Sequence, residues 1–102
     1  MELQQLPILK NEAQRQYQLD VDGHVAFIDY KQGGKRVYLI HTEVPPALEG
    51  LGVAAALVGK VLTHMEQNGE ILIPLCPYVQ AYLKRHPEWN RLLDKPKTNG
   101  ST

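Results

Sequence analysis

The feature that most constrains the fold is a single change in the period of the hydrophobic pattern near residue 45. Before this point hydrophobic and polar residues alternate, as they do in half-buried strands. After it, hydrophobic residues recur at the spacing of a helix from Gly52 to Asn68. Strands followed by a strand–helix–strand–helix end predict an α/β fold of the α+β type, with a mostly antiparallel sheet.

The first half of the chain predicts antiparallel strands joined by short turns. Tyr17, Leu19 and Val21 share one face, which is the period-two signal of a half-buried strand. Asp22-Gly23 follows at once and favours a hairpin, because a type I′ turn needs positive φ at both central positions. A looser turn is expected at residues 32–35. The expected strands are Gln16–Val21, His24–Tyr30 and Arg36–Val44.

The second half predicts a crossover and a second helix. The long helix should stop at Gly69, because glycine is common just past helix C-termini. Ile71–Leu75 is short and apolar, and a right-handed crossover would place it parallel to the third strand. A proline at the first helical position then predicts a helix over Pro77–Arg85, with one more turn over Glu88–Leu93.

Size and composition indicate one small domain without a strong charge. The 102 residues fit a single domain. Basic and acidic residues balance at 11 each, so the basic excess typical of nucleic-acid-binding proteins is missing. One cysteine, Cys76, excludes an internal disulfide and a multi-cysteine zinc site. No apolar run is long enough for a membrane span, and no signal peptide is recognisable, so we expect a cytoplasmic protein without a membrane partner.

Gly50 and Gly52 open the long helix, and this turn is the strongest sign of a binding site. Free N–H groups at a helix N-terminus bind anions, usually phosphates. A dinucleotide-binding turn fits poorly, because residues 45–49 separate the glycines from the preceding strand. A P-loop does not fit, because Gly59-Lys60 is followed by Val61 inside the predicted helix. The turn alone predicts either a phosphate site or a purely structural feature.

Several segments, in order, resemble the GNAT superfamily of acyl-CoA-dependent N-acyltransferases. The signature of that superfamily is Gln/Arg-x-x-Gly-x-Gly/Ala between a strand and a helix, where this chain has Glu49-Gly50-Leu51-Gly52-Val53-Ala54. HTEVPPALEGLG, PLCPYV and AYLKRHPEW, with NEAQRQYQL and DGHVAFIDY before them, are similar to its minimal YjdJ-type branch. The resemblance covers residues 6–93 as one acyl-CoA-binding domain and leaves residues 94–102 as a polar tail that we expect to be disordered.

The resemblance implies where acetyl-CoA or coenzyme A would bind. Main-chain amides from Leu51 to Ala55 would bind the pyrophosphate, and the strand end from Thr42 to Val44 would pair with the pantetheine arm. The implied cofactor-binding residues are Thr42, Glu43, Val44, Gly50, Leu51, Gly52, Val53, Ala54, Ala55, Cys76, Tyr78 and Tyr82. Glu49 departs from the signature, so we expect its side chain to point away from the phosphates.

Cys76 lies between a predicted strand and the N-terminus of a predicted helix, where the helix dipole favours a thiolate. In the pose that the resemblance implies, the thiol lies near the thioester. It would then be an acyl-accepting nucleophile or a wall of the acyl pocket. A small buried hydrophobic residue is the third interpretation.

Glu43 and His41 lie two positions apart on one strand and therefore share a face. An attacking amine must lose a proton, and a free lysine has a pKa of about 10.4, so the reaction needs a base near neutral pH. Glu43, directly or through a water, is the first candidate base and His41 is the second. Solvated polar residues on a surface strand are the alternative.

Tyr78 and Tyr82 lie four positions apart on one face of the second helix. In the superfamily a tyrosine on this helix often protonates the departing thiolate, and Tyr82 best matches that position. An ordinary core aromatic residue is the alternative. No metal is expected, because His24 and His64 share no ligand spacing with each other or with Cys76.

The leading function is acetyl-CoA-dependent transfer of an acyl group to an unidentified amine, direct or through Cys76, with the backbone at Val44 polarising the thioester carbonyl. A non-catalytic acyl-CoA-binding module that regulates a partner is the alternative, and an interaction domain without a cofactor is a third. Typical members of the superfamily carry two helices where this chain has Asp22-Gly23. The acceptor groove should therefore be open or completed by a partner, and we expect a monomer or weak dimer.

Overall fold

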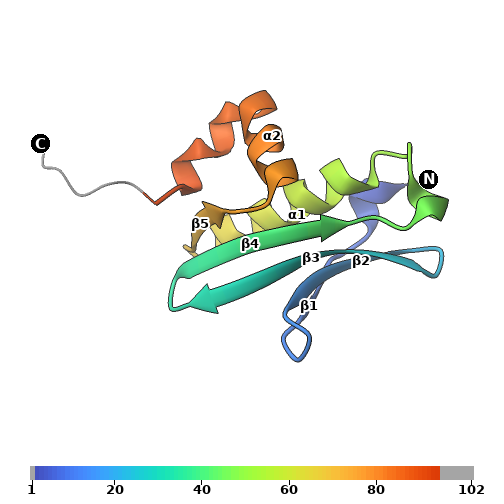
Figure 1. The fold of residues 1–102 in the computed structure, drawn as a ribbon, viewed down its shortest axis with the longest axis horizontal. Coiled ribbons are helices and arrows are strands. Elements are labelled where there is room, and N and C mark those ends of the chain that lie inside the picture. Colours follow the sequence, from blue (N-terminus) through green and yellow to red (C-terminus); the bar gives the residue numbers. More distant parts are fainter. Residues whose placement is uncertain (1, 95–102) are drawn as a thin grey trace, which may run out of the picture.

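The computed structural model describes residues 2–94, which contain one five-stranded sheet (Figure 1). The strands lie side by side in chain order, so that each one neighbours the next. Neighbours among the first four are antiparallel, and the last strand is parallel to the fourth. The strands are β1 (Leu9–Asn11), β2 (Gln16–Val21), β3 (His24–Gly33), β4 (Arg36–Glu43) and β5 (Ile71–Pro74).

The predicted meander and the parallel crossover are confirmed, and β1 is an addition. β1 pairs with β2 over three positions, and a strand this short offers no alternation from which to predict it. The β2–β3 hairpin turns at Asp22 and Gly23, whose φ angles of 54° and 86° are those that a type I′ turn needs. The Asp20 carboxylate accepts a hydrogen bond from the Gly23 amide at 2.8 Å.

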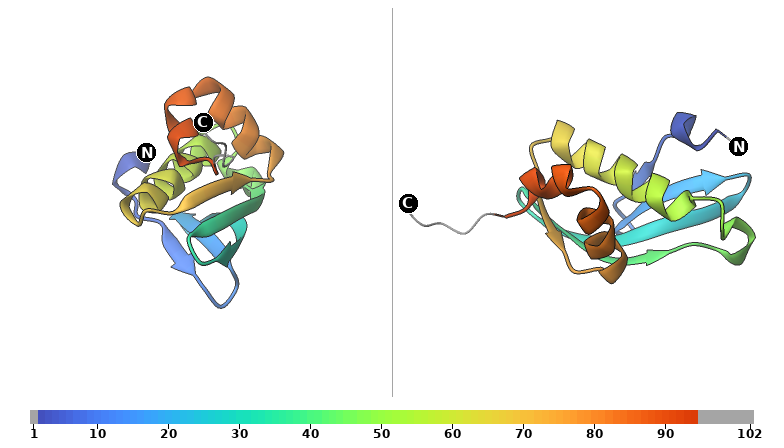
Figure 2. Two further views of the ribbon diagram at one scale, coloured as in Figure 1. Left: turned by 90° about the vertical axis from the view of Figure 1, so that its left-hand side faces the viewer. Right: turned by 90° about the horizontal axis from the view of Figure 1, so that it is seen from above.

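Two α-helices cover one face of the sheet. They are α1 (Val53–Gln67) and α2 (Pro77–Arg85), and Figure 2 shows both on the same side of the strands. Their bounds agree closely with the predicted ones, because proline and glycine mark their ends in the sequence. Short 3₁₀ turns precede or follow them: η1 (Leu3–Gln5), η2 (Pro46–Leu48) and η3 (Pro87–Leu92).

The core lies between these helices and the covered face of the sheet. Alternate residues of β2 and of the middle of β3 are buried there, as the period-two pattern requires: Tyr17, Leu19, Val21, Ala26, Ile28 and Tyr30. The apolar stripe of α1 packs onto these strands. The largest fully buried side chains are Tyr17, Leu19, Ile28, Leu39, Leu57, Leu62, Met65 and Leu72. The opposite face of the sheet carries no helix among residues 2–94.

An irregularity in β4 decides which face each of its later residues occupies. Asp29 pairs with His41, whereas the next residue of β3, Tyr30, pairs with Leu39, so Ile40 is an extra residue in β4. Such a bulge re-aims the side chains that follow it. Pairing with β5 ends at Leu39 and Pro74, so no strand of the described part of the chain pairs with the β5 side of β4 beyond Leu39.

The predicted tail lies almost wholly outside the described residues. Asp94 is its one described member, and its carboxylate accepts a hydrogen bond from the Arg36 Nε at 3.0 Å. Within residues 2–94 no helix has the length and apolar character to cross a bilayer.

Candidate cofactor-binding and active site

The turn before α1 holds two glycines in a conformation that other residues rarely adopt. Gly50 has a φ of 78° and Gly52, the N-cap of α1, has a φ of 77°. Left-handed backbone raises the energy of other L-residues by roughly 1–2 kcal/mol. A Cβ built on either glycine would meet no protein atom within 4 Å. The space beside these glycines is therefore open, and a ligand could approach the backbone closely.

The first turn of α1 presents N–H groups without partners to this open space. The first intrahelical bond runs from the Ala56 amide to the Gly52 carbonyl at 3.1 Å. The Leu51 amide lies 3.4 Å from the Leu48 carbonyl, a long contact. Within residues 2–94 no acceptor bonds the amides of Gly50, Gly52, Val53, Ala54 and Ala55. Free amides and the positive end of the helix dipole together favour an anion here.

These amides border a hollow of about 190 Å³. Val44, which directly follows β4, and Tyr78 in the first turn of α2 also line it, so it connects the turn with the end of β4. Leu51 does not line it and leaves 47% of its surface exposed. Seven predicted cofactor-binding residues therefore meet at one place: Val44, Gly50, Gly52, Val53, Ala54, Ala55 and Tyr78.

Glu49, where the signature usually has Gln or Arg, also lines this hollow. Glu49 is exposed, and its side chain does not cap α1 by a hydrogen bond. A carboxylate therefore stands at the rim of a site that otherwise suits an anion.

Cys76 lies between the end of β5 and the start of α2, where β5 and β4 no longer pair. The Leu75 and Cys76 amides both donate to the Leu39 carbonyl at 2.9 Å, and the chain then turns into α2. The Cys76 side chain is 3% exposed, and its Sγ lies 3.3 Å from the Thr42 Oγ1. Thr42 pairs with the buried Ile28, so both side chains lie on the helix side of the sheet. Thr42 and Cys76 thus meet across the gap between the two strands.

His41 and Glu43 lie on the other side of β4. Their cross-strand partners, Asp29 and Phe27, alternate with buried residues and so point away from the helices. His41 Nε2 lies 2.8 Å from Glu43 Oε1, and the side chains are 56% and 55% exposed. The structure therefore brings these two candidates together on the uncovered face, and separates them from the Cys76 thiol by the backbone of β4.

The two predicted tyrosines occupy different places. Tyr78 lines the hollow beside Val44, whereas Tyr82 lines a separate groove over α1. The Tyr82 hydroxyl lies 3.1 Å from the position that a Cβ on Gly59 would take. Burial, and then the nearby Glu88 carboxylate, raise the pKa of the Tyr82 phenol, so this group stays protonated at neutral pH. Of the two, Tyr78 is the one that the structure places beside the free amides.

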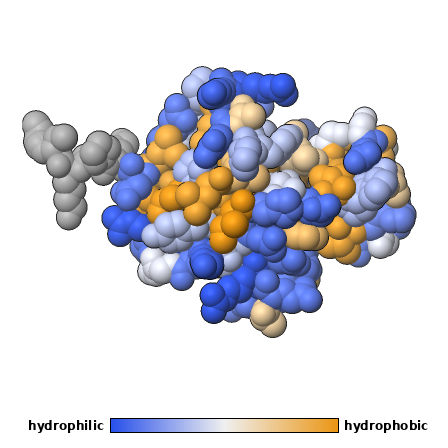
Figure 3. Space-filling view, in the orientation of Figure 1, coloured by the Kyte–Doolittle hydropathy of each residue, from blue (hydrophilic) through white to orange (hydrophobic). Residues whose placement is uncertain are grey.

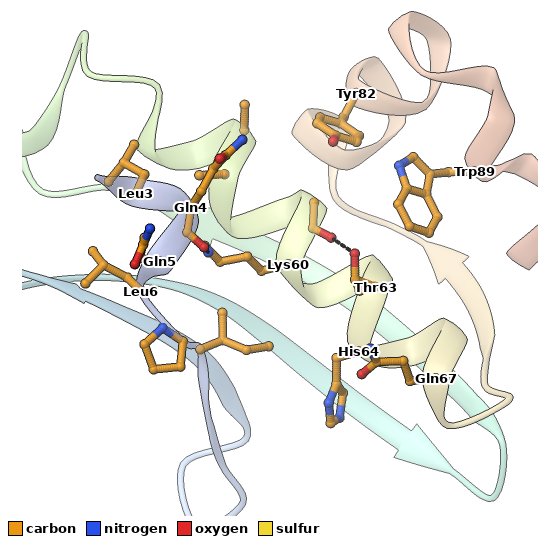
Figure 4. Close-up of a pocket in the computed structure, with 15 residues that line it drawn as sticks. Leu3, Gln4, Gln5, Leu6, Lys60, Thr63, His64, Gln67, Tyr82 and Trp89 are labelled. Atoms are coloured by element: carbon orange, nitrogen blue, oxygen red, sulfur yellow. Dashed lines mark hydrogen bonds between the residues drawn. The ribbon is translucent and has the colours of Figure 1, made fainter. Parts of the chain in front are cut away.

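The groove over α1 holds about 720 Å³ and was not predicted (Figure 4). The segment from Leu3 to Ile8 forms one wall, and Tyr82 and Trp89 form the other. Its floor is a face of α1 rich in small residues, and this pattern is the signal in the sequence that could have found it. Ala55 lines both the groove and the hollow, so the two adjoin on α1.

The surface around the site has separate hydrophobic and hydrophilic regions. Figure 3 shows hydrophobic surface over β5 and again where the loop enters α1, with hydrophilic surface over the later part of β4 between them. Leu75 and Tyr78, 54% and 39% exposed, contribute large apolar groups near the gap. In the part of the chain that the structure describes, no three His, Cys, Asp or Glu side chains lie together as metal ligands would.

Comparison with known proteins agrees with this geometry. The sequence model of the GCN5-related N-acetyltransferase family matches residues 16–92, which is most of the chain. The chain belongs to this family. The match includes the glycine turn, β4, β5 and Cys76, so the family assignment covers every element that builds the hollow.

Two further proteins are similar in sequence, and one solved structure is similar in fold. Protein NATD1 of Mus musculus is 34% identical over 76 residues, a match that covers 72% of this chain and 69% of NATD1. Protein NATD1 of Gallus gallus is 36% identical over 63 residues, 61% of this chain and 57% of that protein. A GCN5-like protein from Staphylococcus aureus, solved by NMR, matches the fold with a TM-score of 0.67 at 21% identity, over 93% of this chain and 94% of that one.

Membership of the GCN5-related N-acetyltransferase family confirms the resemblance and the mixed α+β fold. It supports a function of the N-acetyltransferase type. A family assignment does not by itself give residue roles, so the roles of the individual residues named above stay predictions.

Proposed function

We propose that this chain is an acetyl-CoA-dependent N-acetyltransferase whose acceptor amine approaches from the uncovered face of β4. The observation that carries the proposal is the set of free amides at the start of α1, which face a hollow shared with Val44 and Tyr78. A family member with this arrangement has a place for both ends of an acyl-CoA: phosphates at the helix and a thioester at the strand edge.

The residues present suit the pyrophosphate of coenzyme A. Free N–H donors and the helix dipole would stabilise its negative charge. At Gly50 and Gly52 the side-chain position is empty, so the phosphates could reach the backbone. Glu49 at the rim opposes this binding, because like charges repel. We therefore expect a weaker complex than an arginine or glutamine at this position would allow.

The edge of β4 suits the pantetheine arm. Beyond Leu39 this edge lacks a strand partner, so backbone groups up to Val44 are free to pair with the amides of an extended ligand. Cys76 and Thr42, in contact on the helix side of the gap, would form a wall for the acyl end.

Residues around the hollow and on β4 could carry out each step of acyl transfer. Glu43 would take the proton from the attacking amine, and the His41 hydrogen bond would hold the Glu43 carboxylate in position. The N–C bond forms as the C–S bond breaks, and the backbone amide at Val44 would stabilise negative charge on the carbonyl oxygen. Tyr78, rather than Tyr82, would return a proton to the thiolate, because Tyr78 lines the hollow.

We propose direct transfer, because Cys76 is buried and hydrogen-bonded to Thr42. A route through an acetylated Cys76 makes a different prediction, a mass increase of the protein with acetyl-CoA alone. Acetylation that Cys76→Ala abolishes would replace direct transfer by the covalent route. A cytoplasmic location and a monomeric or weakly dimeric state stay predictions.

The test compares Glu43→Gln with Glu12→Gln, which removes the same charge at the exposed turn between β1 and β2. Release of coenzyme A from acetyl-CoA is followed with and without amines. We expect the wild type and Glu12→Gln to release it faster with an amine, and Glu43→Gln to lose about a hundredfold in rate, the scale of general base catalysis. Tight binding without turnover across an amine panel would instead favour the non-catalytic module, and absence of binding would refute both.

A further inference from the structure

Four side chains on the uncovered face form a square beside the acceptor end of the proposed site. Phe27 of β3 lies opposite Glu43 of β4, and Asp29 lies opposite His41. On β3 these two residues alternate with Ala26 and Ile28, which are fully buried, so they point to the uncovered face. Asp29 and Glu43 occupy diagonal corners, and diagonal residue positions on an antiparallel strand pair are about 7–8 Å apart.

The square combines the groups that attract a cation. Asp29 is held in place, because its Oδ1 accepts a hydrogen bond from the Gln16 Nε2 at 3.1 Å. Phe27 is half-buried and lies beside Asp29 on the same strand face. A carboxylate and an aromatic ring each attract an ammonium group, and the aromatic contribution grows as the cation loses water. The β3 side of the square, formed by Asp29 and Phe27, is therefore complementary to an ammonium group.

A cationic side chain limits this anionic region on one side. Lys31 follows Asp29 on the same face, opposite Tyr38, and no carboxylate within residues 2–94 pairs with it. Arg36, further along, is already paired with Asp94 at 3.0 Å. Asp29 would therefore attract a second positive charge on a ligand, whereas Lys31 would repel a charge placed further along β3. This geometry selects a short ligand.

We infer that the acceptor is a short diamine-like cation, whose reacting amine contacts Glu43 while an ammonium group a few carbons away reaches Asp29, diagonal positions about 7–8 Å apart in a sheet. This inference rests on the proposed function, because it takes Glu43 as the base. The reacting amine loses its proton to Glu43 and forms the new N–C bond, while the thiol of coenzyme A leaves. The second amine keeps its charge and is held by Asp29 and Phe27. Asp29 and Phe27 are thus specificity-determining residues.

The experiment uses butane-1,4-diamine as the probe and butylamine, of equal chain length with one amine, as its comparison. NMR titration of the protein saturated with coenzyme A measures binding, and release of coenzyme A from acetyl-CoA measures turnover. We expect the diamine to be preferred by a factor of about three to ten at low salt, the scale of an exposed ion pair plus a cation–π contact. The preference should fall as salt screens the charges.

Variants locate the preference. Asp29→Asn keeps the size and the Gln16 contact, and Phe27→Leu keeps an apolar side chain, and each should lower the diamine-to-butylamine ratio severalfold. Asp22→Asn is the matched control, because it removes one negative charge at the hairpin tip where asparagine also tolerates positive φ. This control should keep the wild-type ratio.

A wild type that binds both amines equally overturns the inference, and so does a preference that survives in Asp29→Asn. Binding measured by NMR needs no turnover. Selective diamine binding near Phe27 and His41 without acetyl transfer would therefore support the inference on the ligand and refute the proposed reaction. Acetylation of butylamine as efficiently as the diamine would do the reverse.

Discussion

Replacing Gly52 by alanine separates the conformational role of this glycine from its role in binding phosphate. Gly52 has a φ of 77° and Gly34, in the β3–β4 turn, has a φ of 61°. A Cβ on either would meet no protein atom within 4 Å. Strain alone should therefore destabilise Gly52→Ala and the control Gly34→Ala equally, by roughly 1–2 kcal/mol.

Only Gly52→Ala should weaken binding of acetyl-CoA. Its methyl group would occupy open space at a residue that lines the hollow beside the free amides of α1. Losing one hydrogen bond to a charged group removes about 1.5–3 kcal/mol, which corresponds to at least about a tenfold loss of affinity. Urea denaturation measures the stability of both variants, and calorimetry with acetyl-CoA measures their affinity. Unchanged affinity in Gly52→Ala, or an equal loss in Gly34→Ala, would show that the phosphate site is elsewhere.

Two further variants test the packing on either side of α1. The buried Tyr17 hydroxyl has no hydrogen-bond partner among residues 2–94, so Tyr17→Phe should lower stability at pH 7 by less than about 1 kcal/mol, or raise it. Burial and the Glu70 carboxylate raise the pKa of the Tyr17 phenol in the folded protein. Above about pH 10 Tyr17 therefore loses its proton in the unfolded state first, and the free energy of unfolding falls. Urea denaturation at several pH values should show that Tyr17→Phe reduces this fall by roughly 1.4 kcal/mol per pH unit. Gly59→Ala should stabilise α1 by up to about 1 kcal/mol. The new Cβ would lie 3.1 Å from the hydroxyl of the half-buried Tyr82, which can move aside. A lower melting temperature of this variant would show that Tyr82 cannot move.

Local signals in the sequence predict most of the fold. The alternation in β2 and β3, the Asp22-Gly23 turn and the helical period of α1 each depend on neighbours along the chain. The glycine turn is likewise local, and it leads directly to the hollow. Such turns can be predicted from the sequence because their backbone conformation requires particular residue types.

Features that depend on pairing between distant segments could not be predicted. The extra residue at Ile40 exists only in the register between β3 and β4, yet it decides that Thr42 faces the helices while His41 and Glu43 face away. The separation of Tyr78 from Tyr82 depends on how α2 lies against α1. Strand β1 is too short to show a period and forms only against β2.

The most direct test of the account is an amide-resolved NMR titration with coenzyme A. The free amides of Gly50, Gly52, Val53, Ala54 and Ala55 are expected to shift most, together with Val44, as they bind the pyrophosphate and the pantetheine arm. Amides that already have partners, such as Ala56, should respond less. Saturable shifts confined to other residues, with these amides unmoved, would contradict the account.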